Sequence, residues 1–348
     1  MVIRTYSRRQ TGKHGRGILT LIALLMLSLL AGCTESDTNQ TTTPQQSSQA
    51  QQTTSTSSPQ PGKIKVVTTF LPMYMFTKAV AGDVADVEIL VPPGTEVHEY
   101  QSTPKDVKAI ATANVLVKNG LGLEEFLDNT IKNAHNSKLY ITDASKNIQP
   151  LNEISPIEKT SKQEKEHNHG GAGEHHHEHA EGNPHVWLDP VLAKQQVANI
   201  RDGLIAADSA NKATYEANAA AYIKQLDNLN SEFQQTLQKT PSCTFITFHD
   251  AFPYLAKRYN IKQVAVVEIP EDQLAPADVQ NAVNAVKKYK VKALFSEPGV
   301  DNKLLTSLSK DLNLTLRSLN SLETGNTDPQ YYFTAMQENL QTLETACK

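Results

Sequence analysis

The sequence predicts an α/β protein with two (βα)4-type domains, each built on a parallel sheet, joined by one long rigid helix. The main observation is that short runs rich in β-branched residues alternate with helical patterns of about ten residues, which is typical of βα units. This alternation occurs twice, on either side of one long amphipathic stretch. We therefore expect an N-terminal domain over residues 63–210, a connecting helix over 211–240 and a C-terminal domain over 241–348.

The first half of the chain contains four strand patterns separated by residues that start and stop helices. The expected strands are residues 64–70, 87–91, 114–117 and 139–142. Pro72 opens a helix that Gly82 closes, and Thr103 caps a helix that Pro104 opens. Further helices are expected at 123–134 and after Pro190.

The second half repeats the alternation after the long helix. Apolar residues at spacings of four and three form one stripe along residues 211–239: Tyr215, Ala219, Tyr222, Leu226, Leu229 and Phe233. At 1.5 Å per residue this helix is about 40 Å long, more than one small domain needs, so we expect it to bridge two domains. Strands are then expected at 244–248, 264–269, 293–295 and 314–319, with helices at 251–259, 276–289, 302–312 and after Pro329.

Residues 1–32 have the pattern of a lipoprotein signal peptide. Basic residues precede the apolar run 18–31, which is short for a membrane span. The run ends in Leu-Ala-Gly-Cys, which resembles a bacterial lipobox, so we expect lipid on Cys33; an ordinary signal peptide that happens to end in cysteine is the alternative. Residues 33–62 are rich in Ser, Thr and Gln and suit a flexible tether. The protein is therefore expected outside the cytoplasmic membrane, periplasmic or on its outer face, held there only by lipid.

Charge and cysteine usage limit the function classes further. The formal net charge of −4 argues against a nucleic-acid partner. Besides Cys33, only Cys243 and Cys347 are present. In an exported chain such a pair indicates a disulfide, although two buried free thiols remain the alternative.

The number and placement of the histidines indicate metal binding. Six of them lie within thirteen residues of a glycine-rich, acidic loop at 158–182: His167, His169, His175, His176, His177 and His179. This loop could hold metal weakly at many interchangeable positions or be a solvated spacer. Three more histidines, His98, His185 and His249, follow strands or the long loop, and ligands in open α/β sheets bind beyond the carboxyl ends of strands. Each alone could be a surface or core residue, but together they favour a metal site in a cleft.

Several stretches resemble the solute-binding receptor lipoproteins of zinc and manganese ABC transporters, most closely their zinc-binding ZnuA-type members. PPGTEVHEYQSTPKDVKAIATANVLVKNGLGLEEFLDN, NPHVWLDP and TFHDAFPYLAKRYNI resemble three ligand regions, and LFSEPGVDNKLLTSLSKDLNLTLRSLN resembles part of the C-terminal domain. The resemblance implies a metal in the interdomain cleft, with His98, His185 and His249 as ligands. The family's fourth position, usually acidic, falls on Asn320, so the fourth ligand is Asn320 or water, or Asn320 supports the site from outside.

The resemblance implies a monomeric receptor that captures a metal ion and delivers it to a permease and its ATPase, without performing a reaction. Three imidazoles suit Zn²⁺, whereas manganese sites favour oxygen donors. A receptor for manganese or for divalent metals broadly is the alternative. A zinc hydrolase with Glu99 or Asp250 as base is a different class, disfavoured because the chain lacks an HExxH helix. An adhesin or a metal buffer without a transporter is a third possible class of protein.

Overall fold

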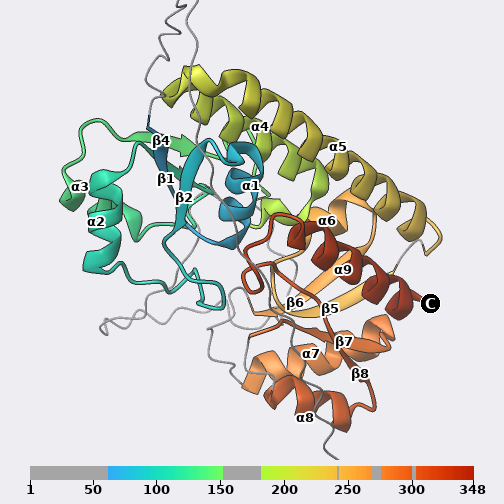
Figure 1. Cartoon of the computed structure of the whole chain (residues 1–348). Coiled ribbons are helices and arrows are strands. Elements are labelled where there is room, and N and C mark those ends of the chain that lie inside the picture. Colours follow the sequence, from blue (N-terminus) through green and yellow to red (C-terminus); the bar gives the residue numbers. More distant parts are fainter. Residues whose placement is uncertain (1–61, 152–181, 241–242, 268–275, 300–302) are drawn as a thin grey trace, which may run out of the picture. The chain divides into compact units, whose positions relative to one another are not determined.

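The structure is a computed structural model that describes residues 62–151, 182–240, 243–267, 276–299 and 303–348 (Figure 1). The expected signal peptide, Cys33, the tether and the six loop histidines lie outside the described residues. Among the residues that are described, no helix combines the length and apolar character needed to cross a membrane.

The N-terminal domain is a four-stranded parallel sheet with the order β2-β1-β3-β4. Its strands are β1 (Ile64–Thr68), β2 (Ala85–Ile89), β3 (Val115–Lys118) and β4 (Tyr140–Asp143). Val66 of β1 pairs with Val87 and Val115, which places β-branched residues side by side in the sheet. Helices α2 (Pro104–Thr112) and α3 (Leu127–Ala134) bury one apolar cluster with the sheet, and α1 (Leu71–Ala81) belongs to another.

The C-terminal domain repeats this topology with the order β6-β5-β7-β8, also parallel. Its strands are β5 (Thr244–His249), β6 (Lys262–Val267), β7 (Ala293–Ser296) and β8 (Thr315–Ser318). Ile246 of β5 pairs with Val264 and Leu294, and all three are buried. The helices are α6 (Pro253–Arg258), α7 (Pro276–Tyr289), α8 (Lys303–Asp311) and α9 (Tyr331–Cys347).

One long helix, α5 (Lys212–Leu237), packs along α4 (Pro190–Ala207) and contacts both domains (Figure 1). All six residues of its predicted apolar stripe are buried. Near its start, Asn218 Nδ2 donates to the carbonyl of Val80 in α1 at 3.0 Å. Further along, the Tyr222 hydroxyl donates to the carbonyl of Pro329, just before α9, at 2.9 Å. The helix therefore links the two domains, as the sequence predicts.

The start of α3 differs from the expected helix, and a disulfide links the two ends of the C-terminal domain. Helix α3 begins at Leu127 rather than near 123, because Leu121 has a positive φ of 55° and Glu124 folds back to accept hydrogen bonds from the backbone N–H groups of Asn119 and Gly120. Cys243, just before β5, forms a disulfide with Cys347 at the end of α9, with 5.3 Å between their Cα atoms.

Candidate metal site

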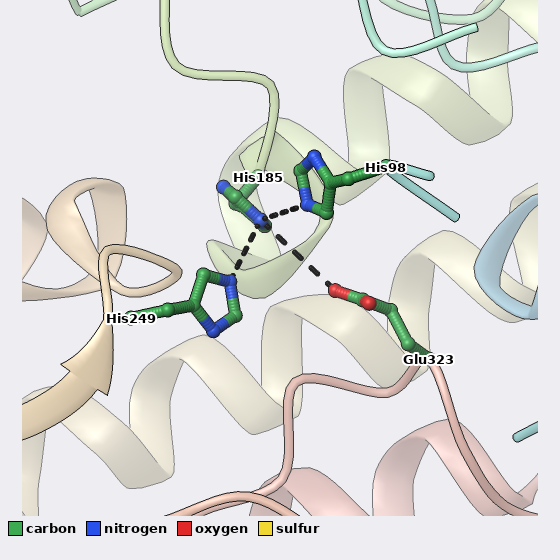
Figure 2. A group of neighbouring side chains, drawn as sticks. All are labelled: His98, His185, His249 and Glu323. Atoms are coloured by element: carbon green, nitrogen blue, oxygen red, sulfur yellow. Dashed lines mark hydrogen bonds and ion pairs between the residues drawn. The ribbon is translucent and has the colours of Figure 1, made fainter. Parts of the chain in front are cut away.

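Three histidines and one glutamate converge at the carboxyl ends of the two sheets (Figure 2). Nε2 of His185 lies 3.3 Å from Nε2 of His98 and 3.1 Å from Nε2 of His249. Oε1 of Glu323 lies 4.0 Å from the same His185 nitrogen. One donor atom from each of the four side chains lies within 4.8 Å of the others. The structure thus brings together all three histidines that the sequence singled out.

The parallel strands explain why these residues meet. His98 lies in the loop that follows β2, and its backbone N–H donates to Glu96 Oε1 at 3.2 Å. His249 is the last residue of β5, and Glu323 lies in the loop after β8. Because strands of one parallel sheet all end at the same edge, β5 and β8 deliver His249 and Glu323 to one place, where His98 from the loop after β2 of the other sheet meets them. His185 comes instead from the segment that leads into the short 3-10 helix Val186–Leu188.

Trp187, the chain's only tryptophan, anchors the segment that carries His185. Its indole is fully buried and packs edge-on against Phe70, with 4.9 Å between ring centroids. Its Nε1 donates to the carbonyl of Ser321 at 2.8 Å, and its own carbonyl accepts from the Tyr332 hydroxyl at 2.8 Å. The apolar side chain and two buried hydrogen bonds fix the backbone two residues from His185.

Each buried histidine has a partner on the ring nitrogen that faces away from the centre. Nδ1 of His185 lies 3.0 Å from Oδ1 of Asn183, which also accepts from the backbone N–H of His185 at 3.0 Å. Nδ1 of His249 pairs with Oε1 of Glu297, a residue that directly follows β7. Partners of this kind select the tautomer and orient the ring of a metal ligand.

Burial and the neighbouring charges act in opposite directions on the pKa of His249. Burial disfavours the charged imidazolium and alone lowers the pKa of His249, but the charge and hydrogen bond of Glu297, with Glu96 and Asp250, raise that pKa above its usual value. His249 therefore keeps a proton more readily than an exposed histidine. A metal ion that binds through Nε2 of His249 must displace that proton.

Nε2 of His185 is a hydrogen-bond acceptor between the other two histidines. Because Nδ1 of His185 donates to an amide oxygen, Nε2 of neutral His185 carries a lone pair, and it faces Nε2 of His98 and of His249. Lone pairs at about 3 Å repel unless a proton or a cation lies between them. The donor set of three imidazoles and a carboxylate suits a divalent cation, and His185 and His249 are only 1 % and 0 % exposed.

A side-chain oxygen of Glu323, three residues after Asn320, lies with the donor atoms of the three histidines. Both ends of the Asn320 amide are engaged elsewhere: Oδ1 accepts from the backbone N–H of Leu322 at 2.7 Å, and Nδ2 donates to the Tyr331 hydroxyl at 2.9 Å. Leu322 adopts a positive φ of 68°, and the turn brings the buried carboxylate of Glu323 next to the histidines. Asn320 therefore shapes the loop that presents Glu323.

Other candidate residues lie outside this cluster. Glu99 is exposed, and Asp250 is buried with its carbonyl accepting from Asn183 Nδ2 at 2.8 Å. Glu297 and Asn183, which pair with Nδ1 of His249 and of His185, were not among the predicted site residues. Glu297 is an acidic residue directly after an expected strand, which is a signal in the sequence, and Asn183 stands two residues before His185 in the stretch NPHVWLDP.

The chain thus has two βα domains joined by a long helix, with a nitrogen-rich group of side chains at their strand ends that could hold a cation. Residues 66–346 match the family described as zinc-uptake complex component A, periplasmic (ZnuA). The chain belongs to this family. It is 35% identical over 288 residues to the zinc-binding lipoprotein AdcA of Streptococcus pneumoniae, covering 81% of this chain and 56% of that protein. The chain thus spans about half the length of such relatives.

A second relative is matched over most of its own length. The high-affinity zinc uptake system protein ZnuA of Bacillus subtilis is 34% identical over 287 residues, covering 81% of this chain and 87% of that protein. Among solved structures, the Zn(II)-bound ZnuA-like domain of Streptococcus pneumoniae AdcA matches with a TM-score of 0.67 at 32% identity, over 82% of this chain and 99% of that chain. The laminin-binding protein Lmb of Streptococcus agalactiae is described as bifunctional, with adhesin and metal transporting activity. Its structure matches with a TM-score of 0.70 at 30% identity, over 82% of this chain and 100% of that chain.

Proposed function

We propose that this chain is an extracytoplasmic zinc receptor of an ABC transporter, which captures Zn²⁺ and delivers it to a permease driven by an ATPase. The observation that carries the proposal is the convergence of three imidazole Nε2 atoms beside a buried carboxylate. The names of its relatives, a zinc-binding lipoprotein and a zinc uptake protein, support the same function.

The proposed ligands are His98, His185, His249 and Glu323. Four ligand atoms about 2.0–2.1 Å from a tetrahedral zinc lie about 3.3 Å from each other. The two closest Nε2 pairs, at 3.1 and 3.3 Å, already have this spacing. Manganese sites favour oxygen donors, so a set with three nitrogens favours zinc over manganese.

The remaining parts of the proposal rest on sequence. Cys33 carries the lipid, the protein acts as a monomer, and the histidines between 167 and 179 hold metal weakly and interchangeably. The receptor performs no reaction, since its proposed work is coordination and release.

Competition calorimetry with zinc and manganese tests the proposal on the chain that lacks residues 1–33, beside the same chain lacking 167–179. We expect one tight zinc event that survives the deletion, with manganese far weaker. Equally tight manganese binding would overturn the metal assignment. Loss of all tight binding with the deletion would show that the histidine cluster in the described structure is not the main site.

A further inference from the structure

The side chain of Asn183 joins the two chain segments that carry His185 and His249. Its Oδ1 accepts from both the backbone N–H and Nδ1 of His185, each at 3.0 Å. Its Nδ2 donates to the carbonyl of Asp250 at 2.8 Å and lies 3.3 Å from Oδ2 of Asp250. Asp250 directly follows His249 in the chain. One amide therefore spans the gap between two of the proposed ligands.

Tyr254 in α6 holds the backbone of the same segment. Its hydroxyl donates to the carbonyl of Asn183 at 2.5 Å and accepts from the backbone N–H of Leu151 at 2.9 Å. Asn183 and Leu151 also bond to each other, N–H to carbonyl, at 3.0 Å. The Tyr254 ring is buried in a small apolar cluster with Ile148 and Val186. These contacts hold the Tyr254 hydroxyl in one position.

All four bonds made by the Asn183 side-chain Nδ2 and the Tyr254 hydroxyl cross from one domain to the other. Asn183 and Leu151 belong to the N-terminal part of the chain, whereas Asp250 and Tyr254 follow β5 in the C-terminal domain. The ion pair of Arg258 with Asp189 crosses the same boundary at 2.7 Å, but Asp189 does not bond to a proposed ligand.

We propose that Asn183 and Tyr254 are positioning residues of an interdomain clamp that holds His185 and His249 at metal-binding distance and slows release of the bound ion. The inference rests on the proposed function and adds to it the part of the molecule that controls release. Separating the two histidines requires the bonds of the clamp to break together. Because buried hydrogen bonds are costly to break without replacement partners, a weaker clamp should let the ion leave faster.

The first test compares Tyr254→Phe with Tyr259→Phe as a matched control. Each change removes one hydroxyl, from Tyr254 within α6 or from Tyr259 directly after it. The Tyr259 hydroxyl donates to Asn230 Oδ1 in α5 at 3.1 Å, away from the histidines. Zinc dissociation is followed by stopped-flow with a chelator in excess, and the melting temperature of the metal-free chain is measured beside it. We expect Tyr254→Phe to speed dissociation about 5-fold or more, and Tyr259→Phe to lower the melting temperature with an unchanged rate.

The second test follows the ring of His185 directly. Nitrogen-15 NMR of the metal-free chain, with His185→Gln for assignment, reports which ring nitrogen carries the proton. We expect the Nδ1-protonated form of His185 in wild type and in Asn183→Asp, which keeps an acceptor oxygen. Asn183→Ala should give a mixture of tautomers and a zinc affinity about 10- to 100-fold lower, the usual size of an effect on a residue that orients a metal ligand.

The outcomes separate the clamp from the proposed function. Wild-type protein without tight zinc binding would overturn the proposed function itself. Tight wild-type binding with an unchanged dissociation rate in Tyr254→Phe, or with the same His185 tautomer in Asn183→Ala, would overturn the clamp alone. Equal acceleration by Tyr254→Phe and Tyr259→Phe would also contradict it, because the effect would then follow general stability.

Discussion

The indole Nε1 of Trp187 donates to the carbonyl of Ser321 at 2.8 Å, and this bond ties the segment of His185 to the loop of Glu323. The two residues are 134 positions apart, and each lies two positions from a proposed ligand. The buried bond therefore positions an imidazole and a carboxylate relative to each other.

Replacing Trp187 by Phe should weaken both the fold and the site. The smaller ring leaves the Ser321 carbonyl without its buried donor, which typically costs about 1–3 kcal/mol. We expect lower free energy of unfolding in urea and lower zinc affinity by calorimetry. Tyr222→Phe is the control, since it removes a hydroxyl that donates to the Pro329 carbonyl from a buried position on α5. The control should lose stability and keep its affinity; equal losses of affinity would contradict the positioning role.

Glu323 and Asn320 should respond differently to substitution. Glu323→Gln removes the negative charge beside the histidines, and we expect zinc affinity to fall at least about 10-fold with little change in melting temperature. Asn320→Ala breaks the bonds to Leu322 and Tyr331, and should mainly lower the melting temperature. Calorimetry and thermal melts on both variants check this. A greater loss of affinity in Asn320→Ala than in Glu323→Gln would restore Asn320 as the ligand.

Zinc binding should release protons and weaken in acid. Imidazole must be neutral to bind metal, and Glu297 helps raise the pKa of His249, which therefore stays protonated to higher pH than an exposed histidine. Lowering the pH adds the competing proton, so affinity falls as the pH decreases. Calorimetry at one pH in two buffers of different ionisation enthalpy measures the protons released. Binding enthalpies that do not depend on the buffer at pH 6 would contradict the prediction.

Glu124 should make the fold less stable as the pH rises towards neutrality. Its carboxyl is buried, and burial raises its pKa from 4.5 to about 7, although it accepts bonds from Asn119, Gly120 and Thr69. A carboxyl with a raised folded pKa binds its proton more tightly in the folded than in the unfolded chain. The stability from this proton is present below the unfolded value and is lost as the pH rises through the folded value.

Urea unfolding of wild type and Glu124→Gln at several pH values measures this effect. At 1.36 kcal/mol per pKa unit, we expect the free energy of unfolding of wild type, relative to the variant, to fall by about 1–3 kcal/mol between pH 4.5 and 7.5. Parallel pH dependence of the two proteins would show that Glu124 does not titrate in this range.

The Cys243–Cys347 disulfide should stabilise the fold without affecting the site. It closes a loop with a sequence separation of 104, and such bonds usually contribute about 2–5 kcal/mol. Cys243 precedes the first residue of β5, whereas His249 is the last residue of that strand, so the two lie at opposite ends. Replacing both cysteines by serine should lower the urea midpoint and leave zinc affinity unchanged. A matching loss of affinity would contradict this separation.

The fold and the three histidines were predictable because local signals carry them. Periodic apolar residues define α5, and each histidine follows a strand or belongs to a dense motif. The approach of Glu323 to the histidines was not predicted, because it depends on the turn at Leu322, where the Asn320 side chain accepts from the backbone N–H of Leu322. Asn183 was present in the motif, but its role appears only when Asp250 and Tyr254 of the other domain lie beside it.

X-ray absorption at the zinc edge, on the zinc-loaded chain without residues 167–179, tests the proposed ligand set most directly. We predict a spectrum of three imidazole nitrogens and one oxygen at about 2.0–2.1 Å, with two imidazoles left in His249→Gln. A spectrum with fewer than three imidazoles in the unsubstituted chain, or no change in His249→Gln, would contradict a site built from His98, His185, His249 and Glu323.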